Sequence, residues 1–142
     1  MRLDVQPIED AVVAALAAAV VLKTEPCPGD PEDFTPSAAR GHALVSFGGA
    51  DWPPEDALDQ RPSRVAFDVQ LFTKSLRTNA GDRGGAYAAI GDASEALSEL
   101  VVGPLVFKPD NARYIDRRGG YWVYGFRAIG TRPDGLQTPD VR

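Results

Sequence analysis

The sequence predicts an α+β domain in which two helices pack on one face of a mainly antiparallel sheet, in the order α-β-β-α-β-β-β. Three observations lead to this prediction. Residues 63–73 alternate apolar and polar side chains, which is typical of a half-buried strand. Residues 85–101 repeat apolar side chains at helical spacing. Short strand-like segments follow, and Gly119 and Gly120 between the last two indicate a hairpin.

The first helix is predicted over residues 7–22, where Pro7 suits the first turn and acidic side chains follow it. Small apolar residues fill nearly its whole circumference, among them Val13 and Ala17. Only one face of a helix can meet the core of its own subunit. We therefore expect deep burial or a contact with another subunit, although the high helix propensity of alanine explains the composition equally well.

Residues 25–62 are rich in proline and glycine, which predicts loops and short elements. Four prolines in residues 25–37 predict a loop with a single short turn at residues 31–34. Residues 42–47 are predicted to form a short, mostly buried strand that ends at a Gly-Gly pair. Residues 51–62 are predicted to form a second loop.

The remaining elements follow from periodicity. The strand at residues 63–73 is expected to point one set of side chains inward: Val65, Phe67, Val69 and Leu71. A polar loop at residues 76–85 precedes the helix at 85–101. Strands are then expected at residues 105–108, 113–116 and 121–129. In the last of these, one face is expected to pack on a helix: Trp122, Tyr124, Phe126 and Ala128. Residues 1–130 are expected to form a single domain and residues 131–142 a flexible or externally docked tail.

Composition and charge disfavour several functional classes. The 142 residues carry 15 basic and 20 acidic side chains, a net charge of −5, which disfavours duplex binding through a basic face. One histidine, His42, and one cysteine, Cys27, cannot build a Cys/His zinc site or an internal disulfide. The longest apolar run, at residues 11–22, has 12 residues, whereas a bilayer span needs about 20. Acidic residues precede it, so we expect neither a membrane anchor nor an export signal.

Candidate catalytic groups are few. His42 is the only imidazole that could act as a base, and its place at the start of an apolar strand favours a packed histidine. Cys27 lies between two prolines without a local feature that would activate its thiol. The acids of residues 30–33 and 51–59 lack calcium-loop spacing. The glycines of residues 81–85 lack phosphate-loop spacing. We expect no catalytic residue, no cofactor and no metal.

Four segments, taken in order, carry a resemblance to a known family. They are residues 8–16 (IEDAVVAAL), 43–50 (ALVSFGGA), 83–87 (RGGAY) and 104–107 (PLVF). Their order and spacing, over residues 5–129, resemble those of the tail terminators of phage Mu and its prophage relatives. The resemblance does not extend to the loops at residues 25–37 and 51–62 or to the tail after Gly130.

The resemblance implies a structural virion protein, not an enzyme, in the tail of a contractile-tailed phage or prophage-derived particle. Such a protein is assembled in the cytoplasm of the bacterial host. Similar terminators form a hexameric ring that caps the tail tube and joins it to the head connector. The resemblance thus implies a homo-oligomer that contacts tube, sheath and neck proteins and no membrane. DNA would pass through the lumen without specific binding, which suits the acidic balance.

In a closed ring, each subunit needs two different surfaces that fit each other. We expect the first helix to supply one, through Val13 and Ala17, and the loop-to-helix junction to supply the other, through Arg77, Arg83 and Tyr87. For Arg83 and Tyr87, a helix-start salt bridge and a core tyrosine fit the sequence equally well. Two other functions remain open: a small enzyme or ligand-binding domain that uses His42 with loop acids, and another neck or head–tail joining protein.

Overall fold

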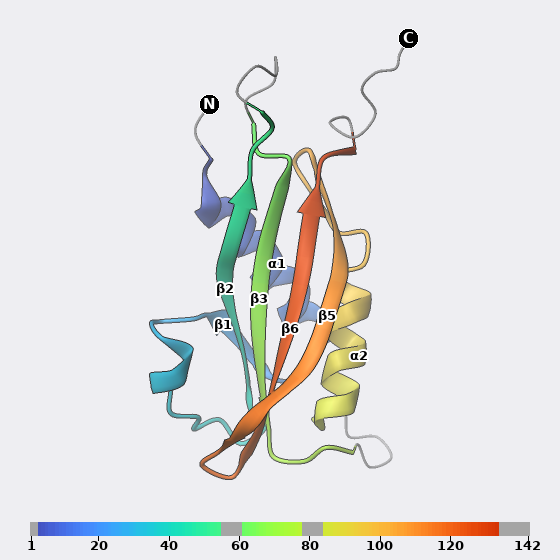
Figure 1. Ribbon diagram of the computed structural model, residues 1–142. Coiled ribbons are helices and arrows are strands. Elements are labelled where there is room, and N and C mark those ends of the chain that lie inside the picture. Colours follow the sequence, from blue (N-terminus) through green and yellow to red (C-terminus); the bar gives the residue numbers. More distant parts are fainter. Residues whose placement is uncertain (1–2, 55–60, 78–83, 134–142) are drawn as a thin grey trace.

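The computed structural model describes residues 3–54, 61–77 and 84–133. Two helices and a curled, six-stranded sheet follow one another in the order α-β-β-β-α-β-β-β (Figure 1). The helices are α1 (Val5–Ala19) and α2 (Ala86–Ala96), and the strands are β1 (Lys23–Pro26), β2 (His42–Asp51), β3 (Arg64–Thr73), β4 (Val101–Val102), β5 (Leu105–Arg118) and β6 (Tyr121–Thr131). The predicted α+β class is confirmed, and the strand count differs from the prediction.

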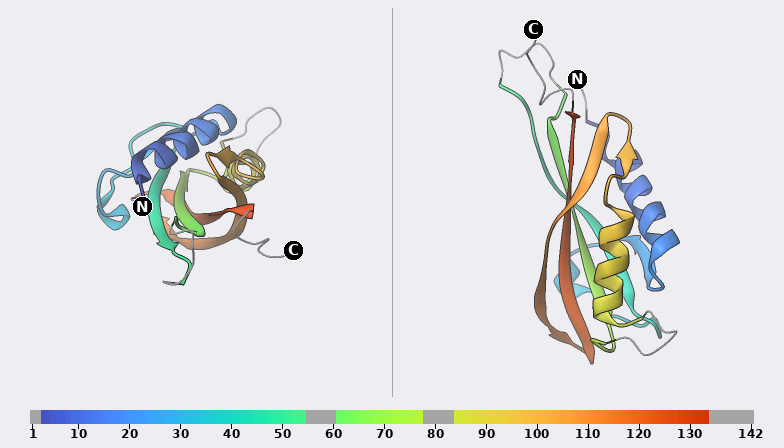
Figure 2. Two further views of the ribbon diagram at one scale, coloured as in Figure 1. Left: turned by 90° about the horizontal axis from the view of Figure 1, so that it is seen from above. Right: turned by 90° about the vertical axis from the view of Figure 1, so that its right-hand side faces the viewer.

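The sheet has the strand order β1-β2-β3-β6-β5-β4. Neighbouring strands are antiparallel except β1 and β2, which run parallel. The central pair, β3 and β6, stays in one register along the whole of β3. Register shifts interrupt the pairing of β2 with β3 and, at two places, that of β5 with β6. Because such bulges increase local twist, they help to curl the sheet (Figure 2).

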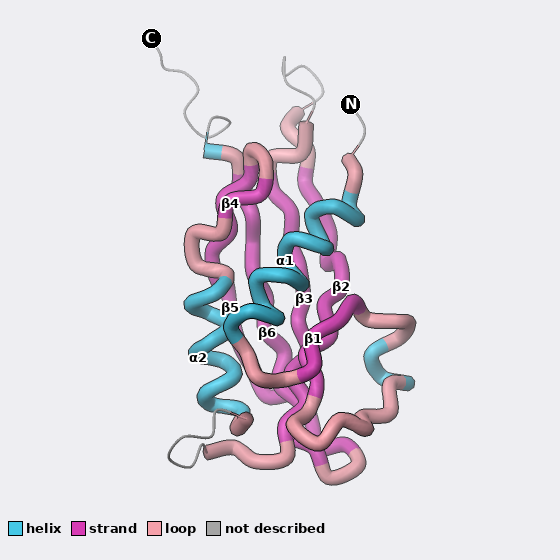
Figure 3. Tube along the Cα trace, turned by 180° about the vertical axis from the view of Figure 1, so that it is seen from behind, coloured by secondary structure: helices cyan, strands magenta, loops and turns pink. Residues whose placement is uncertain are grey.

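Both helices cover the same face of this sheet, as predicted (Figures 2 and 3). The inward set on β3 is the one expected, and each member is 0% exposed: Val65, Phe67, Val69 and Leu71. These side chains share one core with Val12 and Leu16 of α1 and with Ala89 and Ala93 of α2. From β6, Phe126 and Ala128 join this core. The ring of Trp122, in contrast, stacks under the guanidinium of Arg117, 4.3 Å from the ring centroid.

Both helices end earlier than predicted. The helix expected to reach residue 22 stops at Ala19, because Val20 turns extended and the chain enters β1 beside β2. The second helix was expected to reach residue 101 and stops at Ala96. Beyond it, Glu99 adopts a positive φ of 64°. Residues 101 and 102 then pair with the start of β5, and so form β4.

Three strand predictions need correction. The segments 105–108 and 113–116 belong to one strand, β5, which runs through Pro109. Since β4 flanks β5 only at its first two residues, Pro109 lies where a missing N–H breaks no ladder bond on that outer edge.

β2 does not end at residue 47 but continues to Asp51, with the Gly-Gly pair forming a bulge. The predicted tail also starts too early, because Thr131 belongs to β6 and Arg132 is buried; residues 134–142 lie outside the described part.

The connection between β1 and β2, residues 27–41, packs against the other face of the sheet. It contains the 3₁₀ turn η1 (Pro31–Asp33), which confirms the turn expected at residues 31–34. A second apolar cluster lies beneath it, made of Leu44, Phe72, Tyr121 and Val123. Phe34 covers this cluster, with its ring centroid 5.4 Å from that of Phe72. Within the described ranges, neither helix is long and apolar enough to cross a membrane.

Candidate functional site

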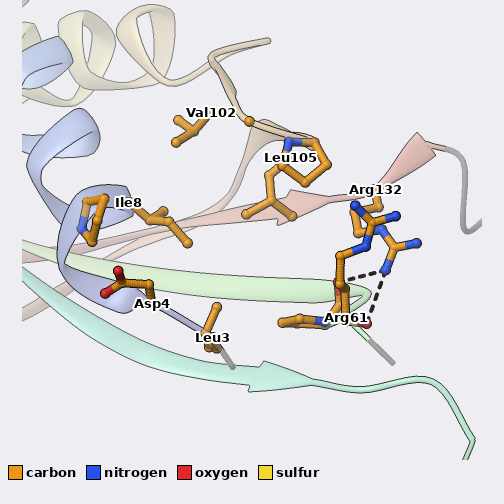
Figure 4. A pocket seen from close by; sticks show the side chains of 11 residues that line it. Leu3, Asp4, Ile8, Arg61, Val102, Leu105 and Arg132 are labelled. Carbon is orange, nitrogen blue, oxygen red and sulfur yellow. Dashed lines mark hydrogen bonds between the residues drawn. The ribbon is translucent and has the colours of Figure 1, made fainter. Parts of the chain in front are cut away.

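An apolar pocket opens at the end of the domain where α1 begins. Its volume is about 340 Å³, and most of its wall is aliphatic or proline: Leu3, Pro7, Ile8, Pro62, Val102, Pro104 and Leu105. They come from the first turn of α1 and the residues just before it, from the residues just before β3, and from the β4–β5 hairpin (Figure 4). The pocket can therefore accept an apolar group, and its walls offer little acid–base chemistry beyond Asp4 at the rim.

Arg132 closes one side of this pocket. Its side chain is 5% exposed, and Nη1 donates hydrogen bonds to the carbonyl oxygens of Arg61 at 3.1 Å and Pro62 at 3.4 Å (Figure 4). These bonds tie the end of β6 to the segment that enters β3. A buried guanidinium needs such acceptors, because burying an unpaired charge is costly. Arg132 thus holds the end of β6 to the residues before β3 and stabilises this side of the apolar pocket.

His42, the one imidazole of the chain, also has a structural role, because it holds the β1–β2 connection to the sheet. Its ring is 2% exposed, and Nε2 accepts hydrogen bonds from the backbone N–H groups of Ser37, at 3.0 Å, and Ala38, at 2.9 Å. Because Nε2 is an acceptor, the neutral ring carries its proton on Nδ1. Nδ1 lies 3.7 Å from Oε2 of Glu25 and makes no hydrogen bond. His42 therefore fixes the β1–β2 connection on the sheet.

A His42-based enzyme would need a concave site that holds the ring and two acids, and the described residues do not assemble one; the loop acids at positions 55, 56 and 59 lie outside the described part. Among the described residues, Glu25 is the carboxylate that comes near the ring, and burial lowers the pKa of His42, against an opposing effect of Glu25. Cys27 is half-buried, and its thiol donates to the carbonyl oxygen of Gly29 at 3.1 Å. No three His, Cys, Asp or Glu side chains gather as metal ligands in the part of the chain described here.

An ion pair crosses the sheet face that the helices leave uncovered. Arg127 of β6 donates to both carboxylate oxygens of Asp68 on β3, at 2.7 Å and 3.0 Å. The hydrogen bond to the Asp68 carboxylate raises the pKa of Arg127 above its ordinary value. Gly48 permits this pair, since a Cβ there would lie 2.6 Å from Oδ2 of Asp68. The side-chain oxygen of Gln70, next along β3, is buried without a hydrogen-bond partner.

Two of the predicted interface residues share one corner of the molecule. Arg77 and Tyr87 are both exposed, and Tyr87 shows 52% of its surface. They are held together because the N–H of Tyr87 donates to the carbonyl of Leu76 at 3.0 Å and the N–H of Ala86 to that of Ser75 at 2.9 Å. These bonds occupy the first amides of α2, which a phosphate would otherwise use. Arg83 lies outside the described residues.

The other two predicted interface residues lie on α1 but differ in exposure. Val13 is half-buried and packs against the main core. Ala17 is exposed on the outward face of α1 together with Ala14 and Ala18, and Val21, just beyond the helix, is exposed as well. The alternative of a core tyrosine at position 87 is wrong, because that side chain is exposed. The structure thus brings Arg77 and Tyr87 together, and places Ala17 on a different surface.

Sequence reasoning did not identify the apolar pocket or the Asp68–Arg127 pair. The pocket is built from residues at positions 3–8, 61–62, 102–105 and 132, and no local pattern joins them. The ion pair depends on the β3–β6 register. A comparison with models of known protein families finds no match, and a search of curated proteins finds none either.

Proposed function

We propose that this protein is a structural subunit that assembles into a closed ring and acts as the tail terminator of a contractile phage tail or prophage-derived particle. The ring caps the tail tube and joins it to the head connector. The sequence resemblance supports this identity over four segments, which include most of α1, most of β2, the first two residues of α2 and the first three of β5. Another neck or head–tail joining protein of the same particle is the runner-up.

The observation that carries the proposal is the presence of two unlike surfaces suited to protein contacts. One is the small apolar outward face of α1, which includes Ala17. The other is the corner at the start of α2, where Tyr87 and Arg77 are exposed. Tyrosine and arginine are enriched at interfaces, and head-to-tail contacts in a ring join two different patches. A subunit of this kind needs no active site.

The direct test is the mass of the purified chain, measured by light scattering across a range of concentrations and again with tail tubes present. We expect a species near six times the 15.2 kDa monomer, alone or on tubes. Negative-stain microscopy should show rings at one end of tubes of limited length. Strict monomers that never bind tubes would overturn the proposal. Rings that bind the head connector and ignore tubes would favour the neck protein.

A further inference from the structure

The corner at the start of α2 carries an excess of positive charge. We call it the basic corner, made of Arg40, Lys74, Arg77 and Tyr87. Arg40 and Lys74 line one small cavity with Ser75 and Gly84, and Lys74 lies 5.5 Å from the centroid of the Tyr121 ring. All four side chains of the corner are exposed. Within the described residues, none of its three cations forms an ion pair with a carboxylate.

The turn η1 carries the opposite charge. Its segment holds three exposed carboxylates, Asp30, Glu32 and Asp33. Asp30 caps the turn by accepting a hydrogen bond from the N–H of Glu32 at 2.9 Å. The turn is itself held in place, because Nη1 of Arg118 donates to the carbonyl of Pro31 at 2.7 Å. In the described part of the chain, no cation neutralises these carboxylates. We call this segment the acidic turn.

The acidic turn and the start of α2, which carries Tyr87, lie on opposite sides of the molecule, whereas Arg40 belongs to the same β1–β2 connection as the acidic turn. In Figure 1, η1 projects on the left, and the first turn of α2 lies at the lower right. Figure 2, from above, and Figure 3, from behind, show the same separation. The acidic turn and the start of α2 would face each other between two copies placed side by side. That arrangement is a head-to-tail contact between unlike patches.

We propose that the basic corner of one copy binds the acidic turn of the next copy. This inference rests on the proposed ring, and it assigns the acidic turn, in place of the outward face of α1, as the surface that the corner contacts in the next copy. Charge complementarity carries it: among the described residues, the turn holds three exposed carboxylates that form no ion pair, and the corner holds three exposed cations that form none, together with an exposed tyrosine. Complementary charges steer encounter and fix register, and Tyr87 supplies rigid contact area. Nucleic acid is a poorer occupant of the corner, because the whole chain carries a net charge of −5 and repels a polyanion.

Charge reversal with rescue tests the contact. Arg77→Glu should raise the concentration of half-assembly by about tenfold or more, because it places like charges opposite each other in every interface of the ring. Glu32→Arg should weaken assembly by a similar factor. An equimolar mixture of the two variants should assemble, because in an alternating ring each corner with Arg77→Glu faces a turn with Glu32→Arg and each unmodified corner faces an unmodified turn. The double variant, Arg77→Glu with Glu32→Arg, should assemble on its own. Assembly of the unmodified chain should also weaken as salt is raised, since these charges are exposed.

Arg64→Glu is the matched control. Arg64 is exposed at the start of β3, at the other end of the domain, so the change alters net charge equally and should leave assembly unchanged. Thermal unfolding of each variant verifies the fold. A wild-type ring whose assembly responds to Arg77→Glu no more than to Arg64→Glu overturns this contact and leaves the proposed function standing. A chain that stays monomeric and off tubes overturns both. Loss of DNA binding alone in Arg77→Glu would assign the corner to nucleic acid.

Discussion

Gly41→Ala should lower the free energy of unfolding by about 3 kcal/mol or more and should loosen the connection that carries the acidic turn. Gly41 has a φ of +100°, a conformation that L side chains rarely adopt. A Cβ at this position would run into the backbone carbonyl of Phe72 on β3. Backbone cannot move aside as the end of a flexible side chain can. Denaturant unfolding followed by tryptophan fluorescence measures the loss.

Gly29→Ala is the control for this prediction. Gly29 belongs to the same connection, but a Cβ there meets nothing within 4 Å and the backbone needs no positive φ. We expect its free energy of unfolding to stay within about 0.5 kcal/mol of that of the unmodified protein, or to rise slightly, because alanine reduces the entropy of the unfolded chain. Equal stability of the two variants would contradict the strain assigned to Gly41. If Gly41→Ala also weakens assembly, the connection is a support of the proposed contact.

Local periodicity explains which parts of the fold could be predicted from the sequence. The alternation along β3 and the apolar stripe of α2 arise within one element, so each was found without knowing its neighbours. β1 was missed because its four residues include Pro26 and show no alternation, and it is a strand only through its pairing with β2. The break expected inside β5 was wrong for a related reason. Pro109 is tolerated there because its outer edge has no partner strand.

In the candidate site, too, features that arise within one segment could be predicted from the sequence, whereas those that depend on tertiary contacts could not. The exposure and proximity of Arg77 and Tyr87 follow from a short connection before a helix, which sequence spacing can reveal. The acids at positions 30, 32 and 33 lack a ligand spacing in the sequence, and only the placement of η1 on the side opposite α2 makes them candidates for the contact proposed here. Arg132 shows the limit most clearly. Its segment reads as a polar tail, yet the register of β6 carries it into the wall of the apolar pocket.

Acidification should destabilise the protein through His42. Burial is the main cause that lowers the pKa of this imidazole below its usual value of about 6.5. The unfolded chain therefore binds the proton more readily than the folded chain does. It follows that the contribution of neutral His42 is fully present above about pH 6.5 and is lost as the pH falls below that value. Glu25, which opposes the shift, and Lys23, which adds to it, are the charged groups that act on the ring.

The size of this loss follows from the hydrogen bonds. A protonated Nε2 can no longer accept from the N–H groups of Ser37 and Ala38. Leaving a fully buried donor unpaired costs about 1–3 kcal/mol, and because these two bonds are only partly buried we expect a loss at the lower end of that range. Unfolding measured between pH 8 and pH 5 should show the decrease, together with greater binding of an apolar dye as Phe72 becomes exposed. His42→Gln separates this cause from general acid effects, because an amide oxygen can accept from the same donors and does not titrate. If the variant loses stability with falling pH as steeply as the unmodified protein does, the carboxylates, and not His42, set the acid limit of this fold.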